Sequence, residues 1–311
     1  MTITPAAKAH LEHQAAVWAA AGPNLTLDQI REIATFDDGS GGVVSPDVNI
    51  VHDYFASPTA YIPVAIYTPK NSSPSELKPA VIFYHGGGWT NNTIKRYEPQ
   101  MSAMSAEGNF VVIGVNYQKA PEHKFPIPFD DSYAGLEWVL KNAARFGIDP
   151  TKIGVCGDSA GGNLAACVAI KARDTGLVKL AFQALIYPTT SFDLEKKSVN
   201  DHAIGFGFTK SALSHHWRSY CDPEFDSNPY ALPSNAKSLA GVAPAIIGLA
   251  EHDVLRDDGI DFAKQLESDG VPVVVKEYPG MIHGFFSHGA KLPEGYALRS
   301  WLVEEINKLC S

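Results

Sequence analysis

The 311-residue sequence predicts an α/β protein in which a mostly parallel sheet lies between layers of helices. Extended runs rich in β-branched or aromatic residues recur along the chain, and from the third run onward helical patterns separate most of them. Runs such as residues 80–84 are almost continuously apolar, which is typical of strands covered on both faces. The length accommodates one large domain of this class with a modest appendage.

Eight runs have the composition of strands. The first two lie close together around residues 57–59, which predicts an antiparallel hairpin at one edge of the sheet. The predicted strands cover residues 48–55, 61–67, 80–84, 110–117, 152–156, 182–187, 245–249 and 271–278. The clearest helical patterns cover residues 128–145, 161–172, 257–268 and 292–309.

Two segments interrupt this alternation. Residues 1–45 have helical patterns without a strand, and residues 189–240 separate two strands by far more than a crossover needs. We therefore expect 1–45 and 189–240 to form a helical cap over the strand ends of the α/β domain, which comprises residues 46–188 and 241–311.

Charge and composition exclude several classes of function. The net charge of −9 argues against a nucleic-acid partner, and no apolar run is long enough to span a membrane. The first residues carry His10, Glu12 and His13 where a secretion signal needs an apolar stretch, so we expect an amphipathic helix there and a cytoplasmic protein. The cysteines lack metal-ligand spacing and are predicted to be buried thiols: Cys156, Cys167, Cys221 and Cys310.

A nucleophilic serine is predicted at Ser159. The sequence Gly-Asp-Ser-Ala-Gly-Gly at residues 157–162 directly follows a predicted strand and opens a predicted helix. Glycines allow such a strained turn, which exposes the serine hydroxyl at the carboxyl end of the strand. An isolated match is as often a simple glycine-rich turn, and the strand-turn-helix context favours the nucleophile.

A glycine run at residues 85–89, His-Gly-Gly-Gly-Trp, follows the strand at 80–84. It predicts an oxyanion hole, because amides must approach a developing negative charge without side chains between. We expect the donors to be Gly86, Gly87 and Ala160. A mobile loop and a phosphate cradle are the alternatives, but a P-loop needs a lysine followed by serine or threonine. His85 precedes the serine and is expected to hold the loop by hydrogen bonds.

The acid and the base are predicted downstream, in the order serine, acid, histidine. Asp253 and His283 each follow a predicted strand, which brings them beside the nucleophile. Glu251 is the alternative acid, and His288 is the nearest rival of His283.

At these residues the sequence resembles the hormone-sensitive-lipase-like esterases, the bacterial family IV carboxylesterases and their relatives. The matching motifs lie at residues 85–89, 120–123, 157–162, 253–257 and 283–285, in the order of that family. The sequence departs from the family at Asn116, Gln118 and Lys119, where Asp, Arg and Leu are usual, and at Val254, where Pro is usual.

The resemblance implies an α/β-hydrolase fold with an eight-stranded sheet and a helical cap. It implies hydrolysis of short-to-medium acyl esters through an acyl-enzyme, without a cofactor or a metal, and frequently a homodimer. Hydrolysis of amides, formamides or lactones by the same triad, and a non-catalytic binding protein on this scaffold, are the alternatives. Aromatic residues that either contact the substrate or pack the cap are Trp89, Tyr187, Phe206, Phe208 and Trp217, with Tyr220 beside them.

Overall fold

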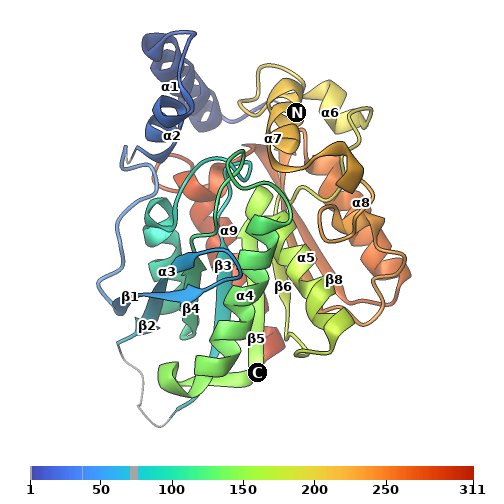
Figure 1. The fold of residues 1–311 in the computed structure, drawn as a ribbon. Helices are drawn as coiled ribbons and strands as arrows, with labels where there is room; N and C mark the ends of the chain where they lie inside the picture. The colour runs from blue at the N-terminus through green and yellow to red at the C-terminus, as the bar shows by residue number, and fades with distance from the viewer. Residues whose placement is uncertain (1, 37, 71–75) are drawn as a thin grey trace.

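The computed structural model describes residues 2–36, 38–70 and 76–311 and confirms the predicted α/β class. An eight-stranded sheet, in the order β1-β2-β4-β3-β5-β6-β7-β8, forms the middle of the molecule (Figure 1). Its strands are β1 (Val48–Ala56), β2 (Tyr61–Pro69), β3 (Lys78–Tyr84), β4 (Val111–Val115), β5 (Ile148–Asp158), β6 (Gln183–Ile186), β7 (Ala245–His252) and β8 (Val273–Ile282).

Strand direction explains where a site can form. β1 and β2 make the predicted antiparallel hairpin at one edge, and β2 also pairs antiparallel with β4. From β4 through β3 and on to β8 every pair is parallel, so these strands end at the same edge of the sheet. In open α/β sheets, ligands bind outside the carboxyl ends of the strands.

Helices cover both faces of the sheet. The alternating residues of β3 separate into two cores, with Ile82 in the core beneath α4, α5 and α8 and Phe83 in the core beneath α3 and α9. This double burial accounts for the continuous apolar runs in the sequence. The flanking helices are α3 (Glu98–Gly108), α4 (Ile127–Asn142), α5 (Ala160–Thr175), α8 (Arg256–Ser268) and α9 (Glu294–Cys310).

The remaining helices lie beyond one end of the sheet, with α1 and α2 on one side and α6 and α7 on the other (Figure 1). They are α1 (Pro5–Ala21), α2 (Leu27–Thr35), α6 (Lys197–Asp201) and α7 (Lys210–Tyr220). The expected amphipathic character of the first helix is wrong, because α1 buries only Ala7 and His10 and leaves Val17 and Trp18 exposed. No helix in the described ranges is both long and apolar enough to cross a membrane.

Single-turn helices complete the connections. They are η1 (Ile94–Tyr97), η2 (Ala143–Phe146), η3 (Pro223–Phe225), η4 (Pro233–Asn235) and η5 (Phe285–His288). The cysteines are buried free thiols, as predicted.

Candidate active site

Ser159 occupies a strained corner between β5 and α5, with φ 55° and ψ −119°. Two glycines make this corner possible. A Cβ at Gly157 would lie 2.3 Å from the Gly161 carbonyl oxygen, and a Cβ at Gly161 would lie 1.9 Å from the Tyr84 carbonyl oxygen. No other residue fits such close backbone contacts. The turn leaves the serine hydroxyl at the carboxyl edge of the sheet and at the N-terminus of α5, which favours nearby negative charge.

The structure brings the three predicted triad residues together. His283 Nε2 lies 2.9 Å from Ser159 Oγ, and His283 Nδ1 lies 2.6 Å from Asp253 Oδ2. The Asp253 carboxylate is buried, and its other oxygen accepts the Leu255 N–H at 2.9 Å. Because a carboxylate only accepts, Nδ1 carries the proton and the free electron pair of Nε2 faces the serine. This tautomer is the one that can remove the serine proton.

The rival residues have other partners. Glu251 accepts the Gly280 N–H at 2.7 Å, which ties the ends of β7 and β8 together. His288 Nδ1 lies 2.7 Å from Ser40 Oγ, and burial lowers the histidine pKa to about 3. Neither is bonded to Ser159.

His85 has the structural role that the sequence predicted. Its Nδ1 donates to the Gly86 carbonyl at 2.8 Å, and its ring stacks on Tyr117 at 4.4 Å. Burial lowers the pKa of His85 to about 3, so the ring is neutral at physiological pH.

The expectation that Gly86 is an oxyanion donor is wrong. Its N–H donates to Asp158 Oδ1 at 2.7 Å, and Gly86, unlike Asp158, does not line the cavity at Ser159. Gly87 and Gly88 do line that cavity. The local sequence does not show this bond, because the carboxylate that accepts the Gly86 N–H lies 72 positions further along the chain.

Hydrogen bonds to the carbonyl oxygens of Gly86 and Gly87 orient the N–H groups of Gly87 and Gly88. The Gly86 oxygen accepts from His85 and from Asn92 Nδ2, and the Gly87 oxygen accepts the Thr90 and Asn91 N–H groups. In a trans peptide the N–H points opposite to the C=O, so these bonds turn the amides of Gly87 and Gly88 toward the other side. Among the described residues neither amide has an acceptor. Ala160, the first residue of α5, likewise has no acceptor within its helix.

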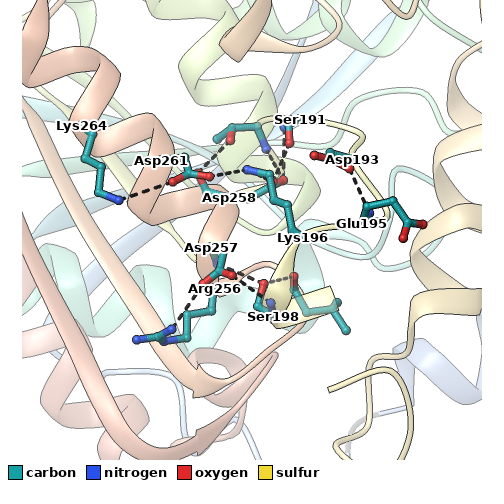
Figure 2. Close-up of polar contacts among 12 residues, drawn as sticks. Ser191, Asp193, Glu195, Lys196, Ser198, Arg256, Asp257, Asp258, Asp261 and Lys264 are labelled. Carbon is teal, nitrogen blue, oxygen red and sulfur yellow. Dashed lines mark hydrogen bonds and ion pairs between the residues drawn. The ribbon is translucent and has the colours of Figure 1, made fainter. Parts of the chain in front are cut away.

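The loop that carries Asp253 is fastened to α6. Ser198 Oγ donates to the Val254 carbonyl at 2.9 Å, and the Ser198 N–H donates to Asp257 Oδ2 at 2.8 Å (Figure 2). Val254 also packs with Val199 in a small apolar cluster between α6 and this loop. The residue next to the acid is therefore fixed by a segment of the 189–240 insertion.

A second contact of the same kind centres on Asp258 in α8. This buried carboxylate accepts the N–H groups of Thr190 and Ser191, each at 3.1 Å, and the Ser191 hydroxyl at 2.6 Å. Lys196 lies 3.0 Å from it, so the start of the insertion is held to α8 by charge and by hydrogen bonds (Figure 2). Burial raises the pKa of Asp258, and the lysine opposes this shift.

A cavity of about 520 Å³ opens above Ser159, between the strand ends and the helices of the two outer segments. One part of its wall is apolar and comes from α1, α2 and the residue after α2, and another part is polar. The apolar residues are Val17, Trp18, Ile33 and Phe36; the polar ones include His10, Asp38, Arg96 and His288.

Of the aromatic residues predicted to contact substrate, Phe208 alone lies at this wall, where its ring stacks on His283 at 4.6 Å. Trp89 and Trp217 are fully buried and pack with Tyr220, so for them the packing alternative holds. Tyr187 lies beneath His283, and Phe206 stacks on His252, outside the cavity lining.

His216, on α7, is a cavity residue that the sequence analysis missed. Its Nδ1 lies 3.0 Å from Thr90 Oγ1, and its ring fills the space where a Cβ at Gly88 would lie. Burial lowers the pKa of His216 to about 4, so it is neutral near pH 7. Nothing in the local sequence distinguishes it from its neighbour His215. Among the described residues no cluster of three or more potential metal ligands occurs.

Comparison with known proteins places the chain in a family. The family of the alpha/beta hydrolase fold matches residues 81–287. The carboxylesterase NlhH of Mycobacterium tuberculosis (strain H37Rv) is 40% identical over 238 residues, which cover 75% of this chain and 73% of that protein. The arylesterase of Saccharolobus solfataricus is 34% identical over 226 residues and covers 72% of each chain.

Solved structures agree with these matches. The ester hydrolase EH1AB1 from the Lake Arreo metagenome, complexed with a derivative of bipyridine phosphonate, has a TM-score of 0.92 and 31% identity over 99% of each chain. The Pyrobaculum calidifontis esterase has a TM-score of 0.88 and 31% identity over 99% of each chain. Fold, motifs and relatives therefore agree: the chain belongs to the hormone-sensitive-lipase-like carboxylesterases of the α/β-hydrolase superfamily.

Proposed function

We propose that the protein hydrolyses carboxylic esters with short-to-medium acyl chains through a Ser159 acyl-enzyme. The observation that carries the proposal is the unbroken chain of hydrogen bonds from Asp253 through His283 to Ser159, at 2.6 and 2.9 Å, beside amides for which the described part of the chain offers no acceptor. The acid is hydrogen-bonded to the base and the base to the nucleophile, as acyl transfer needs. His283 is in the tautomer whose Nε2 can accept the serine proton. The names of the relatives, carboxylesterase and arylesterase, support the ester as the substrate class.

In the first half-reaction Ser159 Oγ attacks the ester carbonyl carbon while His283 Nε2 takes the hydroxyl proton. The buried Asp253 carboxylate stabilises the imidazolium without becoming protonated. Collapse of the tetrahedral intermediate breaks the ester C–O bond, and His283 returns the proton to the leaving alcohol. In the second half-reaction His283 activates a water molecule, which releases the acid from the serine.

The oxyanion is proposed to be held by the amides of Gly87, Gly88 and Ala160. They replace the set that included Gly86, whose amide is bonded to Asp158. Each such donor typically contributes about 10²–10³ in rate. Because hydrogen bonds already hold the glycine loop, its amides need little reorganisation when the oxyanion forms.

The outer helical segments, residues 1–45 and 189–240, are proposed to act as the cap of a catalytic domain formed by residues 46–188 and 241–311. The cavity wall includes residues of α1, of α2, of α7 and of the segment just before α7, so the substrate is enclosed between cap and sheet. A cavity of about 520 Å³ suits a small ester rather than a long-chain lipid. The homodimer implied by the resemblance stays a prediction, to be tested by sedimentation.

The experiment is a series of p-nitrophenyl esters from acetyl to palmitoyl, assayed with the wild type and with Ser159→Ala. We expect turnover that is highest for short acyl groups and is lost in the variant. Matched anilides and lactones test the alternative substrates. A folded protein that turns over none of these and is not labelled by a fluorophosphonate would refute the enzymatic proposal in favour of a binding protein.

A further inference from the structure

Asp158, which lies between the glycine of the turn and the nucleophile, is a buried carboxylate that the proposed reaction does not use. It is 2% exposed. Its Oδ1 accepts the Gly86 N–H at 2.7 Å, and its Oδ2 accepts the Tyr97 hydroxyl at 2.9 Å. The same side chain therefore links β5, the glycine loop after β3, and η1. Since Ser159 follows directly, the bond fixes the glycine loop relative to the nucleophile.

The contact between Asp158 and the loop is tight. A Cβ at Gly86 would lie 2.6 Å from Asp158 Oδ2 and 2.9 Å from the Asp158 carbonyl oxygen. Gly86 is thus held on its N–H side by the carboxylate and on its C=O side by His85 and Asn92. With both sides held, the plane of the peptide that carries the Gly87 N–H has one orientation.

We propose that Asp158 is a positioning residue that fixes the oxyanion donors of Gly87 and Gly88 against Ser159. This inference rests on the proposed function, because it assigns a role within the same acyl transfer. The bond to Gly86 is charge-assisted, and such bonds are shorter and stronger than neutral ones. Asp158 can reach the glycine loop because it directly precedes the nucleophile at the end of β5, beside the end of the neighbouring strand β3.

Titratable groups from η1, from β5 and from the segments that follow β4, β6 and β8 face this carboxylate. Burial raises the pKa of the Tyr97, Tyr117 and Tyr187 hydroxyls and of the Cys156 thiol, so these groups are uncharged near neutral pH. His283 faces it from the end of β8. Burial raises the pKa of Asp158 to about 6, although the bonds from Tyr97 and Gly86 favour the charged form. As the pH falls through this range, the bond to Gly86 changes from charge-assisted to neutral.

The test compares Asp158→Ala, which removes the acceptor, with Asp158→Asn, which keeps an acceptor oxygen but not the charge. We expect Asp158→Ala to lower kcat about 10²-fold with KM nearly unchanged, as for loss of an oxyanion donor. Affinity for a trifluoromethyl ketone, which mimics the tetrahedral intermediate, should fall in parallel. Asp158→Asn should lose about tenfold at pH 8, where the wild-type carboxylate is charged.

The pH dependence separates positioning from a structural role. The ratio of wild-type to Asp158→Asn activity should fall from about ten at pH 8 toward one at pH 5, because protonation makes the wild type resemble the variant. A ratio that is constant with pH overturns the proposal, and this measurement stands even if Asp158→Ala does not fold.

Asp131→Ala is the matched control. Asp131 is also a fully buried carboxylate that accepts a backbone N–H, from Gln118 at 2.9 Å, but it does not touch the glycine loop. The Asp131→Ala variant should have a lower free energy of urea unfolding than the wild type and an unchanged kcat. If Asp158→Ala behaves in the same way, the residue is merely structural. Loss of activity in Ser159→Ala together with unchanged kcat in Asp158→Ala would overturn only this inference, whereas an active Ser159→Ala would overturn the proposed function.

Discussion

Gly87→Ala tests whether the glycine loop supplies the oxyanion donors. Gly87 has φ +116°, a conformation that residues with a Cβ rarely adopt. An added Cβ would lie 2.6 Å from the Asn91 carbonyl oxygen, whereas an ordinary contact begins at 3.4 Å. The loop must therefore move by about 0.8 Å, the difference between these distances, or Gly87 must change its φ. Either response displaces the Gly87 amide.

A displacement of this size predicts a loss of about 10²–10³ in kcat, equivalent to one oxyanion donor or about 3–4 kcal/mol. KM for a short ester should change little, because the ground-state carbonyl carries little charge. Gly87→Pro, which fixes φ near −65°, should be more damaging still. The assay is steady-state hydrolysis of p-nitrophenyl butyrate, with folding checked by urea unfolding.

Gly176→Ala provides the matched control. Gly176 has φ +65° after α5, but no atom lies within 4 Å of the added Cβ. The strain there should lower stability by about 1 kcal/mol and leave kcat unchanged. If Gly87→Ala folds and keeps kcat within threefold of the wild type, the oxyanion assignment is refuted.

Further predictions concern the acid, the cap contacts and pH. Asp253→Asn should lower kcat about 10⁴-fold in a folded protein, because an amide N–H facing His283 favours the wrong tautomer; activity within tenfold of the wild type would contradict this. Asp258→Ala should lower the free energy of urea unfolding by about 3 kcal/mol, since it leaves the Thr190 and Ser191 donors without their acceptor and Lys196 with only Asp261 as its ion partner, and a change below about 1 kcal/mol would argue against the contact. Arg31→Ala removes a two-pronged bond to Glu122 and bonds to two backbone carbonyls, so limited proteolysis should cut within residues 1–35 sooner than in the wild type; equal cleavage rates would contradict this. Burial lowers the pKa of five histidines, and three of them are shifted to about 4 or below. Below pH 6.5 the unfolded chain therefore binds more protons than the folded protein, and the free energy of unfolding should fall between pH 6.5 and 5; a flat profile would oppose this. The pKa values of these three residues are about 3 for His85, about 4 for His216 and about 3 for His288.

The sequence predicts most of the sheet because apolar runs report burial directly. All eight runs form strands, and the 57–59 turn joins a hairpin at the edge. The position of β4 between β2 and β3 was not predicted, because pairing order depends on the path of α3 rather than on local composition. β5 begins at Ile148, before the predicted start, where its first residues pair only loosely with β3 through a register shift.

In the site, too, some features follow from local sequence and others depend on contacts between distant residues. Ser159, Asp253 and His283 each lie at a strand end, so chain order and strand ends alone predict that they meet. Which glycine amides face the cavity depends on the Asp158 carboxylate and on the Gly86 and Gly87 carbonyl partners, and no local pattern contains these contacts. Of the predicted aromatic residues only Phe208 lines the cavity, for a related reason. Large rings pack cores and line cavities alike, and for Trp89 and Trp217 the neighbouring Tyr220 decides the outcome.

The central claim, an acyl-enzyme on Ser159, is tested most directly by rapid-quench mass spectrometry during turnover of p-nitrophenyl butyrate. We expect one butyryl group, on the peptide that contains Ser159, and no such group in Ser159→Ala. Turnover by an unmodified wild type, together with an active Ser159→Ala, would contradict it.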